Sequence, residues 1–310
     1  MKATRDRAIG ALVGLAAGDA VGTTIEFAAK PKYALIDDMV GRGPFRLKAG
    51  EWTDDTAMAL ALADSLLRHP EFDPTDSMNR FVQWHEKGSY SCTGTCFDIG
   101  NTVRAALATF KRTGNPMAGS SDPRAAGNGA LMRLAPVAVR YFADRPKLRE
   151  VAARQTQTTH AAYEAVQASV LFAEILADAI SGKPRSEVLA ARSGSFSPKL
   201  QAIACGASWR GCHRDKISGT GYVVDCLNAA LWAVSRTTSF RSAILLAANL
   251  GEDADTTAAV AGQLAGALYG ASGVPRDWLE KLAWQPRIIS TAERLLAAGL
   301  PDFHELGTCP

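Results

Sequence analysis

Apolar residues recur at every third or fourth position along most of the chain, which is the spacing of an α-helix with one buried face. This pattern predicts helices over residues 57–67, 166–180, 221–234 and 257–269, preceded by a helical stripe that begins near Ala8 and stops at Gly18-Asp19. Runs of alternating β-branched and polar residues, which would indicate half-buried strands, are too short to be convincing. The predicted fold class is therefore all-α.

Loops are predicted where Gly, Pro, Ser and Asn gather between the helical segments. Such clusters occupy residues 41–44, 114–116, 119–129 and 193–198, and none is long or polar enough to link two domains. The sequence also lacks a repeat of about 20–50 residues, the period of solenoid proteins. We therefore expect a single helical domain over residues 5–300.

The composition excludes several classes of protein. Hydrophobic residues make up 47% and charged residues 21% of the 310 positions, so the chain can build a core and is not disordered. The net charge is +3 and the basic residues are scattered, whereas a nucleic-acid-binding surface needs them clustered. We expect no nucleic-acid partner, no export signal, no membrane span, a cytoplasmic location and a monomer.

Cysteine usage fits an intracellular protein. Without a secretion signal, reduced thiols are expected in preference to disulfides. The spacing of Cys92 and Cys96, with Cys212 and His213 downstream, leaves a zinc site as an alternative, although structural zinc sites usually have two closely spaced ligand pairs. The cysteines are Cys92, Cys96, Cys205, Cys212, Cys226 and Cys309.

Two segments place several hydroxyl and carboxylate groups at the start of a predicted helix, one over residues 51–56 and one over residues 251–257. Thr and Asp are favoured at helix N-termini, where their oxygens accept free backbone N–H groups and negative charge suits the helix dipole. Capping, however, needs only one oxygen at each end. The two segments supply four carboxylates and two hydroxyls, on Thr53, Asp54, Asp55, Asp253, Asp255 and Thr256.

If the two helix starts face each other, these carboxylates repel. Like charges about 4 Å apart repel by roughly 4 kcal/mol at an effective dielectric constant of about 20. A cation is then needed between them, either an Arg or Lys side chain from elsewhere or a metal ion, since neither segment contains Lys or Arg. A ligand set of oxygens without His or thiolate favours Mg²⁺ or Mn²⁺, and Ca²⁺ less, because no calcium-binding loop is present.

These segments, together with three others, resemble the ADP-ribosylglycohydrolase family. The resemblance is greatest to the bacterial branch that includes the dinitrogenase reductase-activating glycohydrolase. It runs in the same order from about residue 5 to about residue 285 and rests on residues 18–22 (Gly-Asp-Ala-Val-Gly), Glu26-Phe27, residues 53–56, residues 127–133 (Gly-Asn-Gly-Ala-Leu-Met-Arg) and residues 253–256.

The resemblance implies an orthogonal bundle of α-helices with two Mg²⁺ or Mn²⁺ ions at the floor of a cleft. Thr53, Asp54 and Asp55 would bind the ions from one side, and Asp253, Asp255 and Thr256 from the other. Glu252 departs from the family, many of whose members have glycine there, and we leave it out of the ligand set. The predicted catalytic residues are Asp98, Glu26 and Asp55; a solvated surface glutamate is the alternative for Glu26.

The resemblance also implies a substrate-binding set. Gly127, Asn128 and Gly129 form a predicted turn into a helix, whose backbone N–H groups would bind the diphosphate and ribose. His160 would lie near the diphosphate and Tyr222 would stack on adenine. The alternatives are a turn that only starts a helix and, for His160 and Tyr222, ordinary core side chains of apolar helices.

Asp98, in the stretch Phe97-Asp98-Ile99-Gly100, matches an aspartate that lies near the departing guanidinium in the arginine-directed branch. A carboxylate suits this planar cation because paired hydrogen bonds can form; the alternative is a helix N-cap. The implied function is metal-dependent removal of ADP-ribose from protein side chains, most of all arginine. Alternatives are a protein that binds ADP-ribose or neutralises an ADP-ribosyltransferase toxin, and a hydrolase of small ADP-ribose conjugates.

Overall fold

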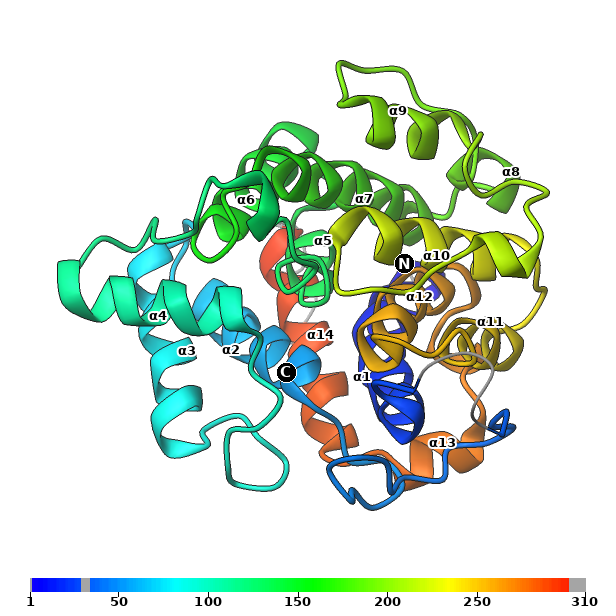
Figure 1. Cartoon of the computed structure of the whole chain (residues 1–310), viewed down its shortest axis with the longest axis horizontal. Helices are drawn as coiled ribbons and strands as arrows, with labels where there is room; N and C mark the ends of the chain where they lie inside the picture. The colour runs from blue at the N-terminus through cyan, green and yellow to red at the C-terminus, as the bar shows by residue number, and fades with distance from the viewer. Residues whose placement is uncertain (1, 29–33, 301–310) are drawn as a thin grey trace, which may run out of the picture.

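The computed structural model describes residues 2–28 and 34–300 as a bundle of α-helices (Figure 1). No β-sheet forms within these residues, and the backbone bridges found there are isolated pairs. The all-α prediction is therefore confirmed. The helices are α1 (Lys2–Gly22), η1 (Thr23–Ile25), α2 (Asp54–Arg68), α3 (Pro74–Lys87), α4 (Asn101–Thr113), η2 (Pro123–Ala125), α5 (Ala135–Tyr141), α6 (Arg145–Gln157), α7 (Tyr163–Ser181), α8 (Arg185–Val188), α9 (Pro198–Cys205), η3 (Arg214–Lys216), α10 (Val223–Ser235), α11 (Phe240–Ala248), α12 (Ala254–Tyr269), η4 (Ala271–Gly273), α13 (Arg276–Lys281) and α14 (Gln285–Gly299).

The four helices predicted from apolar spacing correspond to α2, α7, α10 and α12. Their apolar faces join one hydrophobic core that also takes in α1 and α14 and extends from Ala8 to Leu296. Figure 1 shows α1 and α12 next to each other in the middle of the bundle, with α2 on the other side of α1. This arrangement brings the N-terminal ends of α2 and α12 together.

The prediction that the first helix stops at Gly18-Asp19 is wrong, because α1 continues to Gly22. The glycines of α1 lie at every fourth position, on the face that packs against α12. A methyl group added to Gly14 would lie 2.2 Å from the carbonyl oxygen of Gly262, and one added to Gly18 would lie 2.1 Å from that of Ala258. The cost of glycine in a helix, about 1 kcal/mol each, is thus offset by backbone-to-backbone packing.

α1 is the central helix of the core. The segment Lys2–Ile25 is long and apolar enough to cross a membrane, but 94% of its most apolar window is buried inside the protein. Such burial is typical of a core helix. The absence of a membrane span stays a prediction.

The cysteines in the described part of the chain, Cys92, Cys96, Cys205, Cys212 and Cys226, are free thiols, and Cys309 lies outside the described residues. Within residues 2–28 and 34–300, the groups of side chains that could hold a metal ion consist of carboxylates and include no cysteine. The zinc alternative at Cys92 and Cys96 is therefore excluded.

Candidate active site

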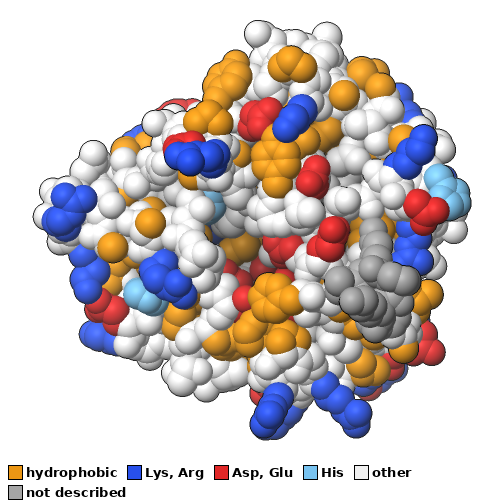
Figure 2. Space-filling model, viewed as in Figure 1, with side chains coloured by type: hydrophobic (Ala, Val, Ile, Leu, Met, Phe, Trp, Pro, Cys, Tyr) orange, Lys and Arg blue, Asp and Glu red, His pale blue; other side chains and the backbone are white. Residues whose placement is uncertain are grey.

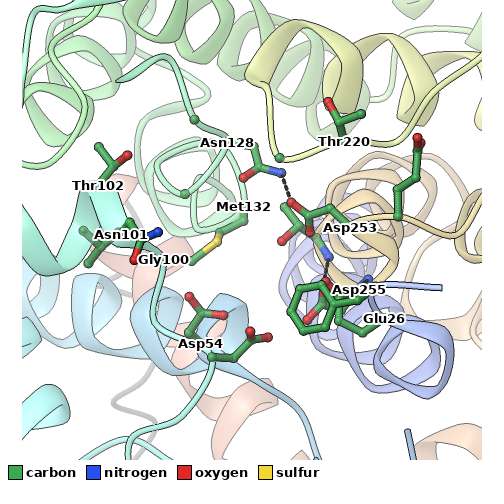
Figure 3. Close-up of a pocket in the computed structure, with 18 of the residues that line it drawn as sticks. Glu26, Asp54, Gly100, Asn101, Thr102, Asn128, Met132, Thr220, Asp253 and Asp255 are labelled. Atoms are coloured by element: carbon green, nitrogen blue, oxygen red, sulfur yellow. Dashed lines mark hydrogen bonds between the residues drawn. The ribbon is translucent and has the colours of Figure 1, made fainter. Parts of the chain in front are cut away.

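The two acidic helix starts meet in space, although about two hundred residues separate them in the sequence. The hydroxyl oxygen of Thr53, just before α2, lies 3.2 Å from a carboxylate oxygen of Asp255 in the first turn of α12. From the other side, the Thr256 hydroxyl lies 3.3 Å from a carboxylate oxygen of Asp55. Figure 3 shows Asp54 facing Asp255 and Glu26 across the space between the helices.

The N-terminus of α2 is capped by Asp19, a residue of α1. One Asp19 oxygen accepts hydrogen bonds from the Thr53 N–H and hydroxyl at 2.9 and 3.0 Å. The other oxygen accepts from the Thr56 N–H and hydroxyl at 3.0 and 2.6 Å. Both oxygens thus use both of their lone pairs. Asp19 therefore orients the helix start instead of offering a free ligand atom, a role that the sequence analysis did not assign to it.

The N-terminus of α12 is capped by Glu26, which follows η1. A single oxygen of Glu26, Oε2, accepts the N–H groups of Ala254 and Asp255 at 2.7 and 3.1 Å. The side chain is buried, with 6% of Glu26 exposed, which rules out the alternative of a solvated surface glutamate. Glu26 also lines the central cavity, so it stabilises α12 and faces the site at once.

Because Asp19 and Glu26 accept the free N–H groups of the two helix starts, the acidic residues of those starts are not needed as caps. Neither Thr53, the N-cap residue of α2, nor Asp253, the N-cap residue of α12, makes a side-chain cap bond. One oxygen of Asp55 is buried with no hydrogen-bond partner within the described structure. An unpaired buried carboxylate oxygen is costly unless a cation binds it.

The carboxylates form two overlapping clusters. One oxygen from each of Asp19, Asp55 and Asp255 lies within 4.8 Å of the other two, and the same holds for Glu26, Asp253 and Asp255. Asp54 belongs to neither cluster but lines the cavity beside them. None of the ion pairs in the described part of the chain involves these residues, so no Lys or Arg side chain occupies the gap between the helix starts.

Burial and mutual repulsion make it hard for these groups to ionise together. Burial, followed by the charge of Asp255, raises the pKa of Asp19 and of Asp253 from 3.8 to about 7. The same causes raise the pKa of Asp54 and Glu26 far above their usual range. For Asp55, burial and the charge of Asp19 have the same effect. This donor set of oxygens, with an orphaned Asp55 oxygen and no neutralising side chain, fits a hard divalent cation.

Asp98 also lines the cavity, in the loop before α4. Its backbone has φ +59°, in the left-handed region that non-glycine residues rarely adopt. Burial and the charges of Asp255 and Asp54 raise its pKa to about 11. The N-cap alternative for Asp98 is wrong, because α4 is capped at Gly100. Backbone strain at a cavity wall is typical of residues that face a ligand.

The glycine-rich turn also reaches the cavity, but differently from the prediction. Gly127, Asn128 and Gly129 line it, yet the following helix, α5, begins only at Ala135. The Asn128 amide donates to an Asp253 carboxylate oxygen at 2.9 Å, which ties this turn to the acidic clusters (Figure 3). The intervening residues form turns, because the N–H groups of residues 131 and 132 both bond to the Asn128 carbonyl.

His160 and Tyr222 differ in how they meet the cavity. Neither lies within a helix: His160 follows α6 and Tyr222 precedes α10. His160 is buried and lines the cavity beside the glycine turn. Tyr222 is next to the lining residue Gly221, but it is not among the lining residues, and its hydroxyl is held by Glu164 and Lys199. Its stacking on adenine stays a prediction.

Glu252 neither joins the carboxylate clusters nor points freely into solvent. Its Oε2 accepts the N–H of Gly219 at 2.7 Å, and this bond holds the loop before α10 against the start of α12. The backbone of Glu252 has φ +62°, which explains why glycine suits this position.

These residues surround a cavity of about 560 Å³, within the range of small-molecule sites. Figure 2 shows it as a hollow with acidic side chains at its floor and hydrophobic side chains along one rim. Phe27, 65% exposed, lines the cavity, with its ring centre 6.2 Å from that of Phe45. Phe45 in turn contacts Phe97 at 5.2 Å, next to Asp98. The cavity thus has a carboxylate floor, a glycine-rich wall and an aromatic rim.

Comparison with known proteins agrees with this geometry. The sequence profile of the ADP-ribosylglycohydrolase family matches residues 1–302. ADP-ribosylarginine hydrolase Tri1 of Pseudomonas putida (strain GB-1) is 49% identical over 303 residues, which cover 97% of this chain and 80% of that protein. ADP-ribosyl-[dinitrogen reductase] glycohydrolase of Rhodospirillum rubrum is 34% identical over 283 residues, covering 89% of this chain and 90% of that protein.

A solved structure described as an ADP-ribosylglycohydrolase-related protein complex superposes with a TM-score of 0.87 at 39% sequence identity. The match covers 97% of this chain and 100% of the other. The fold, the convergent acidic helix starts and the family profile thus agree, and the chain belongs to the ADP-ribosylglycohydrolase family.

Proposed function

We propose that this protein is a metal-dependent hydrolase that releases ADP-ribose from modified arginine side chains of proteins. The observation that carries the proposal is the meeting of the α2 and α12 starts, where carboxylates with raised pKa values surround an unpaired Asp55 oxygen and no cationic side chain intervenes. The relative from Pseudomonas putida, named an ADP-ribosylarginine hydrolase, supports the choice of arginine.

The ions of this proposal are two Mg²⁺ or Mn²⁺, held by the ligands predicted from the sequence: Thr53, Asp54, Asp55, Asp253, Asp255 and Thr256. Without the capping residues Asp19 and Glu26, the two overlapping carboxylate clusters contribute Asp55 and Asp253, with Asp255 shared between them, and this supports two neighbouring positions. When bound, the ions would supply a polarised water and ligation of the ribose hydroxyls. The hydrogen bonds of Asp19 and Glu26 keep the two halves of this ligand set in place.

The rest of the cavity suits the remaining parts of the substrate. The N–H groups of Gly129 and Ala130 have no acceptor among the described residues, so the main chain of this turn can bind an anionic diphosphate. Asp98 lines the same cavity, close enough for the charges of Asp255 and Asp54 to act on it, and its carboxyl can pair with a guanidinium there. Asp98 and Glu26 are placed to hold or move a proton between the substrate and the cavity floor.

The test measures release of ADP-ribose from an arginine-ADP-ribosylated protein in the presence of Mg²⁺ or Mn²⁺. Asp54→Asn and Asp255→Asn should each lower the rate by at least about 100-fold, because each removes a charge that the ions require. Asp277→Asn is the matched control, since Asp277 is an exposed residue of α13 outside the cavity. It should leave the rate unchanged.

Three outcomes would contradict the proposal. Full activity of Asp54→Asn or Asp255→Asn after removal of metal would exclude the metal centre. Faster turnover of free ADP-ribose conjugates than of modified protein would favour the small-molecule alternative. Neutralisation of an ADP-ribosyltransferase toxin by Asp54→Asn as well as by the wild type would favour a binding role.

A further inference from the structure

A buried arginine beside the cavity forms no ion pair with the described residues, although the charge of Asp54 acts on it. Arg133 is 0% exposed, and its guanidinium lies 4.6 Å from the ring centre of Phe81. Its Nε donates to the Gln155 side chain at 3.1 Å, and Nη2 donates to the Thr159 hydroxyl at 2.8 Å. Burial lowers the pKa of Arg133 to about 9. Burying a cation without an ion pair costs free energy, and its hydrogen bonds offset that cost only in part.

Thr159 links this arginine to His160. The Thr159 oxygen accepts from Arg133 and lies 2.9 Å from His160 Nδ1. Because a guanidinium has donors only, the hydroxyl hydrogen of Thr159 is left to point elsewhere. His160 Nδ1 is the only acceptor found for it in the described structure. Nδ1 therefore accepts this hydrogen, and the proton of the neutral ring is on Nε2.

The ring of His160 is neutral, and its Nε2 side faces the glycine turn. Burial, together with the nearby charge of Arg133, lowers the pKa of His160 to about 3. A methyl group added to Gly127 would lie 3.2 Å from His160 Nε2, and one added to Gly129 would lie 2.9 Å from Cε1. The absence of side chains at these two glycines leaves Nε2–H room beside the cavity that His160 lines.

We propose that Arg133 and Thr159 are positioning residues that fix His160 in the Nε2–H form, so that it donates a hydrogen bond to an anionic diphosphate oxygen of ADP-ribose. The identity of this ligand rests on the proposed function. Hydrogen bonds run from Arg133 to Thr159, from Thr159 to His160 and from His160 to the ligand. Each donor fixes the direction of the next hydrogen bond. With the opposite form of the ring, Nε2 would present a lone pair to the anion and repel it.

Thr159→Val removes the hydroxyl and keeps the shape of the side chain, whereas Thr159→Ser keeps the hydroxyl. In Mg²⁺, Thr159→Val should raise both the calorimetric Kd for ADP-ribose and the KM for the modified protein by about tenfold, with kcat changed by less than about twofold. Thr159→Ser should restore the wild-type values. Melting temperatures of both variants show whether folding has been affected.

The ring nitrogens of His160 give a readout that a purely structural role would not produce. In protein labelled with ¹⁵N-histidine, with His160→Gln used to assign the signal, the wild type and Thr159→Ser should carry the proton on Nε2. Thr159→Val should shift the Nδ1 signal to that of a nitrogen without a hydrogen-bond donor. Because the wild-type measurement does not need Thr159→Val, it tests the form of the His160 ring even if that variant does not fold.

A wild-type His160 with its proton on Nδ1, or an unchanged Kd in a folded Thr159→Val, would overturn the inference. So would wild-type protein that does not bind ADP-ribose at all. Failure of the proposed function has a different signature: ADP-ribose binds and His160 carries its proton on Nε2, but no ADP-ribose is released from the modified protein.

Discussion

The two helix starts that form the floor of the cavity are capped in different ways. At α2, Asp19 accepts four hydrogen bonds through both of its oxygens, is fully buried and does not line the cavity. At α12, Glu26 accepts two backbone N–H groups through one oxygen and lines the cavity. Both oxygens of Asp19 are used in hydrogen bonds that cap α2, whereas Glu26 caps α12 with one oxygen and has the other available to bind or move a proton. A cap can therefore contribute to the site only if it is incompletely used.

The largest effect is expected from Asp19→Asn. The amide replaces an acceptor oxygen by a donor that faces the donors of Thr53 or Thr56, so buried N–H and hydroxyl groups lose their partner. We expect the free energy of unfolding of the metal-free protein at pH 8 to fall by about 2–3 kcal/mol, measured by urea denaturation. A fall of less than about 0.5 kcal/mol would show that Asp19 is not the cap of α2.

Glu26→Gln should have a small effect on stability and a large effect on the rate of ADP-ribose release. Glutamine keeps one carbonyl oxygen for the N–H groups of Ala254 and Asp255, so stability should stay within about 1 kcal/mol of the wild type. The rate of ADP-ribose release should nevertheless fall by about 10- to 100-fold, since the second oxygen facing the cavity is lost. If Glu26→Gln is destabilised as strongly as Asp19→Asn, the distinction between the two caps does not hold.

The pH dependence of stability separates the caps further. In the metal-free protein, burial and the charge of Asp255 raise the pKa of Asp19 to about 7 and that of Glu26 far above its usual range. Each native carboxyl keeps a proton that the unfolded chain releases near pH 4, so the unfolding free energy falls as pH rises. At about 1.4 kcal/mol per group and pH unit, these two groups together should lower the unfolding free energy by about 5 kcal/mol from pH 5 to 7, measured by urea denaturation.

Above about pH 7 the native Asp19 also ionises and stops contributing to this decline, whereas Glu26 continues. Because Asp54, Asp55 and Asp98 also keep raised pKa values above pH 7, Glu26→Gln should make the decline less steep there without abolishing it. Asp19→Asn should make the decline less steep only below pH 7. Saturating Mg²⁺ should reduce the decline in the wild type. Stability that rises from pH 5 to 7 without metal would contradict the raised pKa values.

The smallest effect is expected from Glu252→Gly, next to the α12 start. Glycine relieves the strain of φ +62° but removes the hydrogen bond to the Gly219 N–H. Because the two terms oppose each other, stability and ADP-ribose release should stay within about 1 kcal/mol and about threefold of the wild type. A large loss of release with unchanged stability would show that the Glu252 carboxylate itself acts in the cavity.

Local pattern was enough to predict much of the fold and to single out the acidic segments. Four helices followed from apolar spacing, and the excess of carboxylates over capping needs marked the starts of α2 and α12, whereas their joint binding of ions was implied by the family resemblance. The role of Asp19 could not be predicted in this way. A lone aspartate after Gly18 looks like a helix end, and its purpose becomes visible only when α1 crosses the start of α2.

Glycine misled the prediction for a related reason. Helix propensity penalises Gly18 and Gly22 in an isolated helix, but it takes no account of the neighbouring α12, which needs these positions bare. Similarly, the glycine turn at residues 127–129 predicted an immediate helix. The bonds of the next residues to the Asn128 carbonyl delay α5 until Ala135. In both places, contacts distant in sequence decide the local outcome.

The contact between α1 and α12 fixes the distance between the two sides of the proposed ion site. Gly10, Gly14, Gly18 and Gly22 meet main-chain atoms of the partner helix along its length, so atomic radii set the separation. In an ordinary helix interface, side chains can change rotamer and the distance between the two helices can change with them. Main chains that are in direct contact do not allow such a change. The spacing between Asp19 and Asp255 is thus set by main-chain contacts, both beside these residues, at Gly18 and Gly22, and farther along α1, at Gly10 and Gly14. Gly14→Ala should push α1 and α12 apart and should weaken metal affinity without changing any of the proposed ligands.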